Sequence, residues 1–507
     1  MYKETIENKF LKEFFAKMDE SYLAITFADV KLKSGHSKVM PDDVKVNSYF
    51  SKNVPLKVPI VSAAMDTVTE SKLAIGMASF GGIGVIHKAL TIEQQAEEVK
   101  KVKTYMNGLI LSPFTVSMDT NMSFVKDMIE NEELNFSTFP VVDDSNKLLG
   151  ILTRTDIEFC DDLKMKVTEY MNKEILTGSS DVDLEESYEI MKKGRKKFLP
   201  LIDSEGKLAG IYTLSDVKRL LHSEKSDCNI DKNGQLRVAA AIGIKDYDRA
   251  KALIDAGVDA LVIDTAHGDT EAMIETIKYL KSMKGRKVDV VAGNISEPTG
   301  IKALIEAGAD AIKVGQGPGS ICTTRIIAGI GAPQLTAVYK CVTEAQKQGN
   351  KVPIIADGGI QYSGDIPMAI GVGASSVMLG SLLAGTDESP GMVVLVEGNQ
   401  YKTYRGMGSV TAMQNSAASR ERYGQNDNVK SSIVPEGIEG LIAHRGKLFD
   451  VLTQYKVGLQ RGMGYVGAAD IAELKLKAKF HRLTQSAVQE SHPHDIVSIK
   501  EAPNYKK

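Results

Sequence analysis

The sequence predicts an α/β protein, a (β/α)8 TIM barrel into which a duplicated unit has been inserted. Three observations lead to this prediction. Short apolar strands alternate with helical stretches eight times, their spacing breaks down once between residues 86 and 238, and that gap contains an internal repeat. The strands are rich in Val, Ile and Ala, as parallel strands buried on both faces should be.

The eight predicted strands each precede a helical stretch. Two successive units read alike, because residues 256–264 and residues 307–315 both consist of a helix end, a tight turn and a buried strand. Eight such units close most simply into a parallel barrel. The predicted strands are Pro59 to Ala63, Gly82 to Ile86, Val238 to Ile242, Ala260 to Asp264, Val288 to Ala292, Ala311 to Val314, Ile354 to Ala356 and Ser376 to Leu379.

Length and composition limit the classes of protein that the chain can belong to. Its 507 residues, 43% of them hydrophobic, can build more than one core. A net charge of −3 gives no broad basic surface, so nucleic acid is not an expected partner. No apolar run is long enough to span a bilayer and the first residues lack a secretory signal, so we expect a cytoplasmic protein that does not enter a membrane. The four cysteines form no Cys-x-x-Cys pair, which argues against a zinc knuckle and a disulfide framework.

The domain boundaries follow from the position of the gap. We expect residues 1–110 to form the first part of the barrel and residues 226–507 to form the rest. The insertion, residues 111–225, is expected to divide into residues 111–165 and residues 166–225. Each half contains a strand, a turn, a second strand and a helix start, and is expected to bury its apolar face partly against the other half.

A Thr and an Asp, three residues apart, close each copy of the repeat at a predicted helix start. Asp156 of the first copy corresponds to Asp216 of the second, 60 residues later. These side chains can cap the helix, and that is one interpretation of the pattern. The strand-Gly-strand-Thr-x-x-Asp ending also resembles a tandem CBS (Bateman) domain pair, a family whose members often bind adenine or guanine nucleotides. This resemblance implies a regulatory nucleotide site, for ATP or GTP, at Thr153, Asp156, Thr213 and Asp216.

The loop after the sixth predicted strand carries one cysteine among glycines and hydroxyls, in the sequence Gly-Gln-Gly-Pro-Gly-Ser-Ile-Cys-Thr-Thr-Arg over residues 315–325. The glycines let the backbone turn tightly and direct consecutive N–H groups at an anion or a carbonyl-like oxygen. The hydroxyls and Arg325 can hold a polar ligand and favour the thiolate of Cys322. From the residues alone, Cys322 is either a nucleophile or an inert cysteine in an ordinary turn.

Polar side chains and glycines also follow other predicted strands at their carboxyl ends, where barrel active sites lie. Glycines after the last two strands suit a phosphate, because backbone N–H groups must approach its oxygens closely. Asp357 can accept hydrogen bonds from a ribose diol, so a phosphorylated ribose fits, although each glycine pair is also compatible with a plain turn. The segments are Asp264-Thr265-Ala266-His267-Gly268, Gly293-Asn294, Asp357-Gly358-Gly359 and Gly380-Ser381.

A long polar segment, residues 398–435, is unlike barrel scaffold. It contains Tyr404-Arg405-Gly406-Met407-Gly408-Ser409 and, further on, the pair Arg422-Tyr423. Its length, polarity and glycines are typical of a mobile flap. A solvated disordered loop is the alternative.

The cysteine loop, the Asp-Gly-Gly segment, the Tyr404 to Ser409 segment, the Arg-Tyr pair and the interrupted barrel together resemble the IMP dehydrogenase family of the bacterial type, over nearly the whole chain. The resemblance implies NAD-dependent oxidation of IMP to XMP in guanine nucleotide biosynthesis. It implies that Cys322 attacks C2 of the purine and that hydride passes to NAD⁺. The flap then closes, and Arg422 and Tyr423, assisted by Thr324, activate the water that hydrolyses the covalent intermediate.

The same resemblance implies the other site residues. A homotetramer, or an octamer formed through the CBS pair, is implied because a K⁺ site is shared between subunits. IMP would contact Ser320, Asp357, Gly358, Gly359, Gly380, Ser381, Tyr404, Gly406, Met407, Gly408 and Glu436. NAD would lie near Asp264, Thr265, Asn294, Gly315 and Arg325. The K⁺ ion would be held by carbonyls of Gly317, Gly319 and Cys322, with Glu490, Ser491 and His492 of a neighbouring subunit.

Two other functions remain open at the level of sequence. A GMP reductase would share the barrel and a similar cysteine loop, but it has no hydrolytic step for Arg422 and Tyr423 to serve. A nucleotide-sensing regulator would use the CBS pair and an inactive barrel, which the retention of Cys322 and Thr324 argues against. Gln316 departs from the family pattern, which has a small aliphatic residue there, and we expect it to alter cation affinity or loop mobility.

Overall fold

The computed structural model of the chain comprises two compact units, formed by residues 1–103 with 226–507 and by residues 104–225. The residues that the structure describes are 7–107, 109–110, 113–130, 138–222, 227–285, 287–349, 352–425, 433–495 and 505. None of the helices in these ranges combines the length and the apolar character needed to cross a membrane.

The first unit contains a closed barrel of parallel strands in the order β13-β14-β15-β16-β17-β18-β4-β5. The predicted (β/α)8 barrel is thereby confirmed, and β5 pairs directly with β13 although the second unit lies between them in sequence. The barrel strands are β4 (Ile60–Ser62), β5 (Ile83–Ile86), β13 (Ala239–Ile242), β14 (Ala260–Asp264), β15 (Asp289–Ile295), β16 (Ala311–Val314), β17 (Ile354–Asp357) and β18 (Ser376–Leu379).

Small and branched side chains fill the barrel interior. Alternate residues of a strand, such as Ala239 with Ala241 or Ala260 with Val262, belong to a single buried cluster. This period of two is expected where one face of each strand points to the barrel axis. A hairpin formed by β2 (Ser48–Ser51) and β3 (Val54–Leu56) contributes to the same cluster through Phe50.

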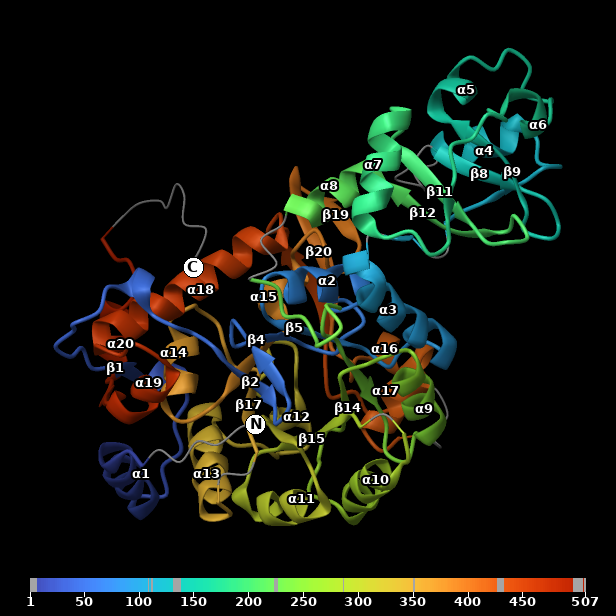
Figure 1. The fold of residues 1–507 in the computed structure, drawn as a ribbon. Helices are drawn as coiled ribbons and strands as arrows, with labels where there is room; N and C mark the ends of the chain where they lie inside the picture. Colours follow the sequence, from blue (N-terminus) through green and yellow to red (C-terminus); the bar gives the residue numbers. More distant parts are fainter. Residues whose placement is uncertain are drawn as a thin grey trace. The chain divides into compact units, whose positions relative to one another are not determined.

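Helices surround the strands. In Figure 1, α9, α10, α11 and α13 follow one another along the outside of the barrel. Capping helps to set where they begin: the Thr270 side chain accepts a hydrogen bond from the Met273 amide at the start of α10. This layer consists of α2 (Ser71–Ser79), α3 (Ile92–Thr104), α9 (Tyr247–Asp255), α10 (Glu271–Ser282), η4 (Pro298–Gly300), α11 (Ile301–Ala307), α13 (Gln334–Lys347), α14 (Asp365–Gly371), α15 (Ser381–Ala384) and α18 (Leu448–Val466).

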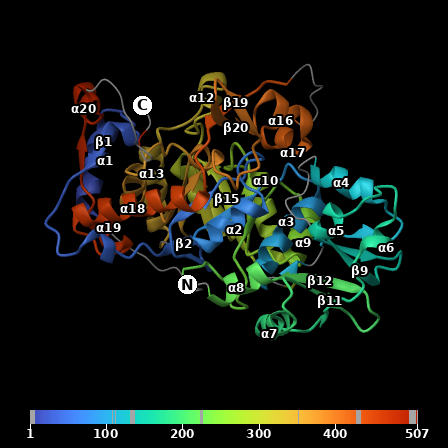
Figure 2. The ribbon, with the colours of Figure 1, turned by 90° about the horizontal axis from the view of Figure 1, so that it is seen from above.

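An antiparallel sheet and three short helices lie on one side of the barrel, opposite the β2 hairpin (Figure 2). The segment predicted to be a flap begins in this sheet and continues through two of the helices, while its residues 426–432 lie outside the described residues. The elements are α12 (Thr324–Ile327), β19 (Val393–Val396), β20 (Asn399–Arg405), α16 (Val410–Asn415), α17 (Ala417–Arg422) and β21 (Glu439–Ala443).

Segments from the N-terminal and C-terminal parts of the chain pair beside the barrel. Strands β1 and β22 form an antiparallel pair in which Val30 faces Arg482. The remaining elements of the first unit are α1 (Lys9–Glu20), η1 (Phe27–Asp29), β1 (Val30–Leu32), η2 (Pro41–Asp43), α19 (Ile471–Lys477), β22 (Phe480–Arg482) and α20 (Gln485–Glu490).

The second unit contains two small sheets of matching construction. In the first, Phe139 faces Leu152, and in the second Leu199 faces Tyr212, with an irregularity at the equivalent place in each pair. The first half consists of η3 (Tyr105–Asn107), β7 (Val116–Ser117), α4 (Met122–Glu130), β8 (Thr138–Val142), β9 (Leu148–Thr153), α5 (Arg154–Glu158) and α6 (Val167–Tyr170). The second half consists of β10 (Gly178–Ser179), α7 (Leu184–Gly194), β11 (Phe198–Ile202), β12 (Leu208–Thr213) and α8 (Leu214–His222), with β6 (Leu109–Ile110) added to its sheet.

Candidate active site

The cysteine loop joins β16 to α12 at the carboxyl end of the barrel. Gly315 has a φ of 151°, and a Cβ on it would lie 2.1 Å from the Asp357 carbonyl oxygen. Only glycine allows this approach of the loop to the end of β17. The loop places Cys322 Sγ 3.2 Å from Thr324 Oγ1, within hydrogen-bonding distance for a thiol and a hydroxyl.

A segment beyond the flap helices pairs with the cysteine loop. The Thr323 amide donates to the Glu436 carbonyl at 2.9 Å, and the Ile438 amide donates to the Ile321 carbonyl at 3.0 Å. Cys322 and Gly437 therefore face each other as in an antiparallel bridge. This pairing fixes the backbone on both sides of the sulfur.

A cavity of about 130 Å³ opens beside the sulfur. All four predicted catalytic residues line it, together with most of the predicted cofactor-binding residues and part of the predicted substrate set. Its lining includes Cys322, Thr324, Arg422, Tyr423, Thr265, Asn294, Gly315, Gly317, Gly319, Asp357, Gly358, Tyr404, Gly406, Met407 and Glu436. The structure thus brings together residues from several segments that lie far apart in the sequence.

A second cavity, of about 410 Å³, shares Asp357, Gly358 and Tyr404 with the first. It also contains Gly359, Gly380 and Ser381, which the sequence indicated for a phosphate, and Ser320 of the cysteine loop, which the resemblance assigned to IMP. The first three lie after the seventh and eighth barrel strands and at the start of α15, where backbone N–H groups are available to an anion. Burial raises the pKa of Tyr404 to about 12, so this side chain is a neutral hydrogen-bond donor.

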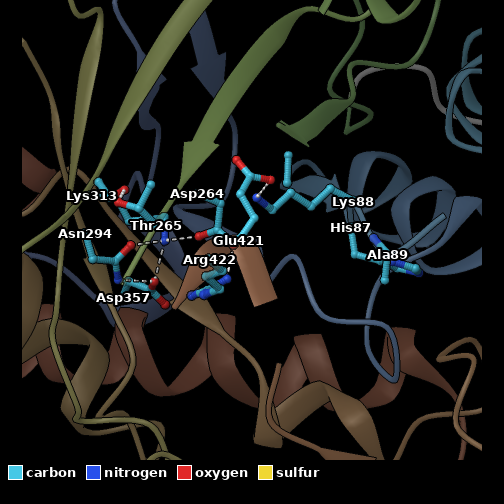
Figure 3. Close-up of polar contacts among 12 residues, drawn as sticks. His87, Lys88, Ala89, Asp264, Thr265, Asn294, Lys313, Asp357, Glu421 and Arg422 are labelled. Carbon is cyan, nitrogen blue, oxygen red and sulfur yellow. Dashed lines mark hydrogen bonds and ion pairs between the residues drawn. The ribbon is translucent and has the colours of Figure 1, made fainter. Parts of the chain in front are cut away.

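Lys313 connects the ends of three barrel strands beneath these cavities (Figure 3). Its Nζ donates to Asp357 Oδ2 at 2.8 Å and to Asp264 Oδ1 at 3.2 Å. The same Nζ contacts Asn294 Oδ1, and Asn294 Nδ2 donates to Asp357 Oδ2 at 2.9 Å. The side chain of Lys313 is 2% exposed, so it acts as a buried counter-charge for two carboxylates.

Lys313 was not among the predicted site residues. A lysine inside the apolar strand Ala311–Val314 was the available signal, because a charged side chain is almost never fully buried unless it is paired.

The flap helix α17 lies against the barrel mouth. Arg422 Nη1 donates to Asp264 Oδ2, and the Ala266 amide donates to the Arg422 carbonyl at 3.1 Å. Among the described residues, Arg422 Nε has no hydrogen-bond partner. The ring of Tyr423 packs on Gly408, where an added Cβ would lie 2.6 Å from the ring. Burial raises the pKa of Tyr423, which keeps its hydroxyl protonated.

Gln316 ties the cysteine loop to the two preceding barrel loops. Its Nε2 donates to the Ala266 carbonyl at 2.9 Å and lies 3.1 Å from His267 Nδ1, while its Oε1 accepts from Ser296 Oγ at 2.5 Å. Arg325 closes the base of the same loop, because its Nε donates to the Gln316 carbonyl at 3.1 Å and its Nη2 contacts the Ala332 carbonyl. The Arg325 guanidinium is therefore turned toward its own loop.

The residues predicted to complete a cation site lie in the C-terminal segment. His492 Nδ1 is 3.0 Å from the Tyr505 hydroxyl, and its ring is near that of Tyr362. Glu490 ends α20 and Ser491 caps it. In the described part of the chain, these three residues form no hydrogen bond or ion pair with the cysteine loop. His, Cys, Asp and Glu side chains in the described residues also form no group of three that could hold a metal ion.

The four residues predicted to bind a regulatory nucleotide act as helix caps in the structure. Thr153 and Asp156 form a capping box at the start of α5. Thr213 Oγ1 accepts from the Asp216 amide at 3.1 Å and donates to Asp216 Oδ2 at 2.6 Å. The capping interpretation accounts for these contacts without a ligand.

Comparison with known proteins extends the resemblance to nearly the full chain. The profile of the IMP dehydrogenase / GMP reductase domain matches residues 24–494. The inosine-5′-monophosphate dehydrogenase of Aquifex aeolicus is 49% identical over 486 residues, covering 95% of this chain and 97% of that protein. The one from Staphylococcus saprophyticus is 45% identical over 504 residues, covering 98% of this chain and 99% of that protein.

A solved structure shows the same relationship. It is the crystal structure of a GMP reductase from Trypanosoma brucei in complex with guanosine 5′-monophosphate. The two chains superpose with a TM-score of 0.76 and are 38% identical, and the match covers 94% of this chain and 100% of the reductase chain. The barrel, the cysteine loop and the two cavities thus occur in a chain that resembles both kinds of oxidoreductase. The chain belongs to the IMP dehydrogenase / GMP reductase family, and the curated relatives that it matches from end to end are inosine-5′-monophosphate dehydrogenases.

Proposed function

We propose that this chain oxidises IMP to XMP with NAD⁺, in two chemical steps that both use Cys322. One observation is the main support for this proposal. The sulfur of Cys322, the hydroxyl of Thr324 and the flap residues Arg422 and Tyr423 line one cavity, which adjoins a second cavity with the features of a nucleotide phosphate site.

The second cavity fits the ribose phosphate of the substrate. Backbone N–H groups at Gly359 and Gly380, with the Ser381 hydroxyl, would bind the phosphate. Asp357 lines both cavities, and its Oδ2 is held by Lys313 and Asn294, so Oδ1 is available to the ribose hydroxyls. The base would then lie next to Cys322 in the first cavity.

In the first step the Cys322 thiolate attacks C2 of the hypoxanthine ring, and a C–S bond forms as hydride leaves C2. The nicotinamide ring of bound NAD⁺ supplies the hydride acceptor. The side chains of Thr265 and Asn294, and the Gly315 backbone, line the cavity where this ring would lie. Asp264 is a suitable acceptor for ribose hydroxyls, but Arg422 occupies it here, so the cofactor requires the flap to move.

In the second step water attacks C2, the C–S bond breaks, and XMP and the Cys322 thiol are released. With the flap in the position described, Arg422 and Tyr423 reach the cavity that contains the sulfur. The free Nε of Arg422 and the protonated hydroxyl of Tyr423 can hydrogen-bond the attacking water. Thr324 lies next to the sulfur and can relay one proton of this water to Cys322 Sγ as the C–S bond breaks, while the other proton goes to a purine ring nitrogen.

A monovalent cation, usually K⁺ in this family, fits the cysteine loop through carbonyl groups. Gly317, Gly319 and Cys322 line the cavity. Among the described residues, the Gly319 carbonyl accepts a hydrogen bond only from the Cys322 amide, at 3.1 Å, which leaves a lone pair. Carbonyl oxygens suit a weakly hydrated cation. Glu490, Ser491 and His492 would complete the site from a neighbouring subunit, which would make a homotetramer the functional assembly.

The second unit supports a regulatory role. We propose that it is a tandem CBS pair and that ATP or GTP binds near Thr153, Asp156, Thr213 and Asp216. Thr153 and Thr213 end equivalent strands of two sheets of matching register, and Asp156 and Asp216 lie in the first turn of the helices that follow.

The test is NADH formation from IMP and NAD⁺ by the purified full-length protein in the presence of K⁺. The Cys322→Ala variant is assayed in the same way, and the wild type is also assayed with GMP and NADPH. We expect IMP-dependent NADH formation that falls by at least about a thousandfold in the variant. Cys341→Ala is the matched control, because Cys341 is buried away from the cavity and burial raises its pKa. Consumption of NADPH with GMP, and no reaction with IMP, would establish the reductase instead.

A further inference from the structure

The flap helix contacts the ends of three adjacent barrel strands through two consecutive residues. Strands β5, β13 and β14 are neighbours in the barrel. Glu421 contacts the loops after β5 and β13, and Arg422 contacts Asp264 at the end of β14. The Arg422 contact belongs to the catalytic proposal, whereas the contacts of Glu421 have no part in it.

Lys88 provides the contact from the loop after β5. Its Nζ lies 3.1 Å from Glu421 Oε2, and the side chain is 4% exposed (Figure 3). Glu421 is the one carboxylate among the described residues within ion-pair distance of Lys88. Asp246 adds a weaker attraction and Arg422 a repulsion. Lys88 is thus a buried cation with a single close counter-charge, and that counter-charge is on the flap.

Glu421 also binds the loop after β13. Its Oε1 accepts from the Ile244 amide at 2.8 Å. The carboxylate lies directly over Gly243, because a Cβ built there would be 2.1 Å from Oε1. Both oxygens of Glu421 therefore contact barrel loops when α17 is in this position. The carboxylate fits over Gly243 because this residue has no side chain.

This arrangement makes the flap position depend on one ion pair. A buried charge is costly unless it is paired, and burial lowers the pKa of Lys88 while Glu421 counteracts that effect. When the flap leaves, Lys88 loses its partner but gains access to water. When the flap returns, the pair forms again in a partly dehydrated setting, where the attraction exceeds that of a surface pair.

We propose that Lys88 and Glu421 form a latch that holds α17 against the barrel mouth, and that Lys88 is a positioning residue for the hydrolytic step. The role in hydrolysis rests on the proposed function, whereas the latch itself does not. Because the flap and the cofactor both require Asp264, weakening the latch slows hydrolysis and strengthens cofactor binding.

Hydrogen–deuterium exchange of the full-length protein tests the latch without reference to activity. In Lys88→Met, which removes the charge and keeps a similar length, amides of residues 417–425 should exchange about tenfold faster than in the wild type. Lys245→Met is the matched control, because it removes an exposed ion pair with Glu275 from the same β13 loop. Equal exchange in the wild type and Lys88→Met overturns the proposal.

Kinetics then separate a positioning role from a merely structural one. With Lys88→Met we expect the first-turnover burst of NADH to keep its rate, the steady-state kcat to fall about tenfold, and the KM for NAD⁺ to fall. A structural defect would lower the burst rate and raise the KM for IMP. If the wild type forms no NADH from IMP, the proposed function is refuted. The hydrogen–deuterium exchange result would then be the test of the latch.

A double-mutant cycle identifies the partner. Glu421→Gln can still accept the Ile244 hydrogen bond, but it leaves Lys88 without a counter-charge in the closed state, so it should open the flap more than Lys88→Met does. The double variant should recover toward the level of Lys88→Met, because the unpaired charge is gone. Strictly additive effects in exchange and in kcat would show that the two residues act separately and would overturn the latch.

Discussion

Arg422, on the flap helix, donates a hydrogen bond to Asp264, the last residue of β14. Asp264 is also bound by Lys313 through its other oxygen, so both oxygens of a buried carboxylate are occupied. Asp264 was assigned to the cofactor by resemblance. We therefore propose that the flap and the dinucleotide take turns at the same side chain.

Replacing Arg422 should separate the two proposed steps. In Arg422→Gln we expect one equivalent of NADH to form at close to the wild-type rate, while steady-state turnover falls at least about a hundredfold, because the group that assists the water is missing. Intact-protein mass spectrometry should show a purine adduct, and a digest should place it on Cys322. Equal losses of burst and turnover, with no adduct, would contradict the separate role of Arg422.

Removing the buried cation should destabilise the barrel. Lys313→Met removes the ion-pair partner of Asp357 and leaves Asp264 with Arg422 alone, and breaking such a buried pair costs about 3–5 kcal/mol of the free energy of unfolding. Urea unfolding measures this loss, with Lys245→Met as the exposed control. The IMP kinetics should deteriorate as well, because Asp357 loses the contact that orients it. If Lys313→Met unfolds at the same urea concentration as the wild type, the buried carboxyl groups are protonated in the variant and need no counter-charge.

Gln316→Ile tests whether the unusual amide sets the mobility of the cysteine loop. The substitution removes the contacts to Ala266, His267 and Ser296, while the residues around the phosphate stay in place. We expect IMP binding to remain nearly unchanged and the K⁺ dependence or the turnover number to shift. Titrations with K⁺ at saturating IMP provide the measurement, and identical kinetics in both proteins would rule the role out.

The buried Tyr404 hydroxyl makes stability depend on pH in the alkaline range. Its pKa is raised to about 12, above the value near 10 in the unfolded chain, so the folded state holds the proton more tightly. The contribution is fully present below about pH 10 and is lost as the pH rises to about 12. Relative to Tyr404→Phe, the wild type should lose about 1–2 kcal/mol of unfolding free energy between about pH 9 and about pH 11. A pH-independent difference in urea unfolding would show that Tyr404 is not buried in solution.

The barrel and most of the site could be read from the sequence, because the signals are local. A buried parallel strand is a short apolar run, and each of the eight barrel strands overlaps its predicted range, as Ala260–Asp264 does residue for residue. The carboxyl ends of barrel strands meet at one face, so the segments after them had to converge. Cys322, Asp357 and Gly358 therefore line one cavity, as expected of neighbouring strand ends.

The sequence carried no local signal for the partners of the charged residues that hold this site in shape. The structural role of three charged residues, Lys313, Lys88 and Glu421, depends on partners that lie tens or hundreds of residues away in the sequence. Sequence spacing does not show which residues of such separation meet in the fold. Their identity as lysine or glutamate was visible, but burial and pairing arise only when the chain closes into a barrel and excludes water. The sequence by itself determined the architecture and the reactive groups, whereas tertiary packing decided which charges are buried together, because only the folded barrel sets their dielectric environment and their neighbours.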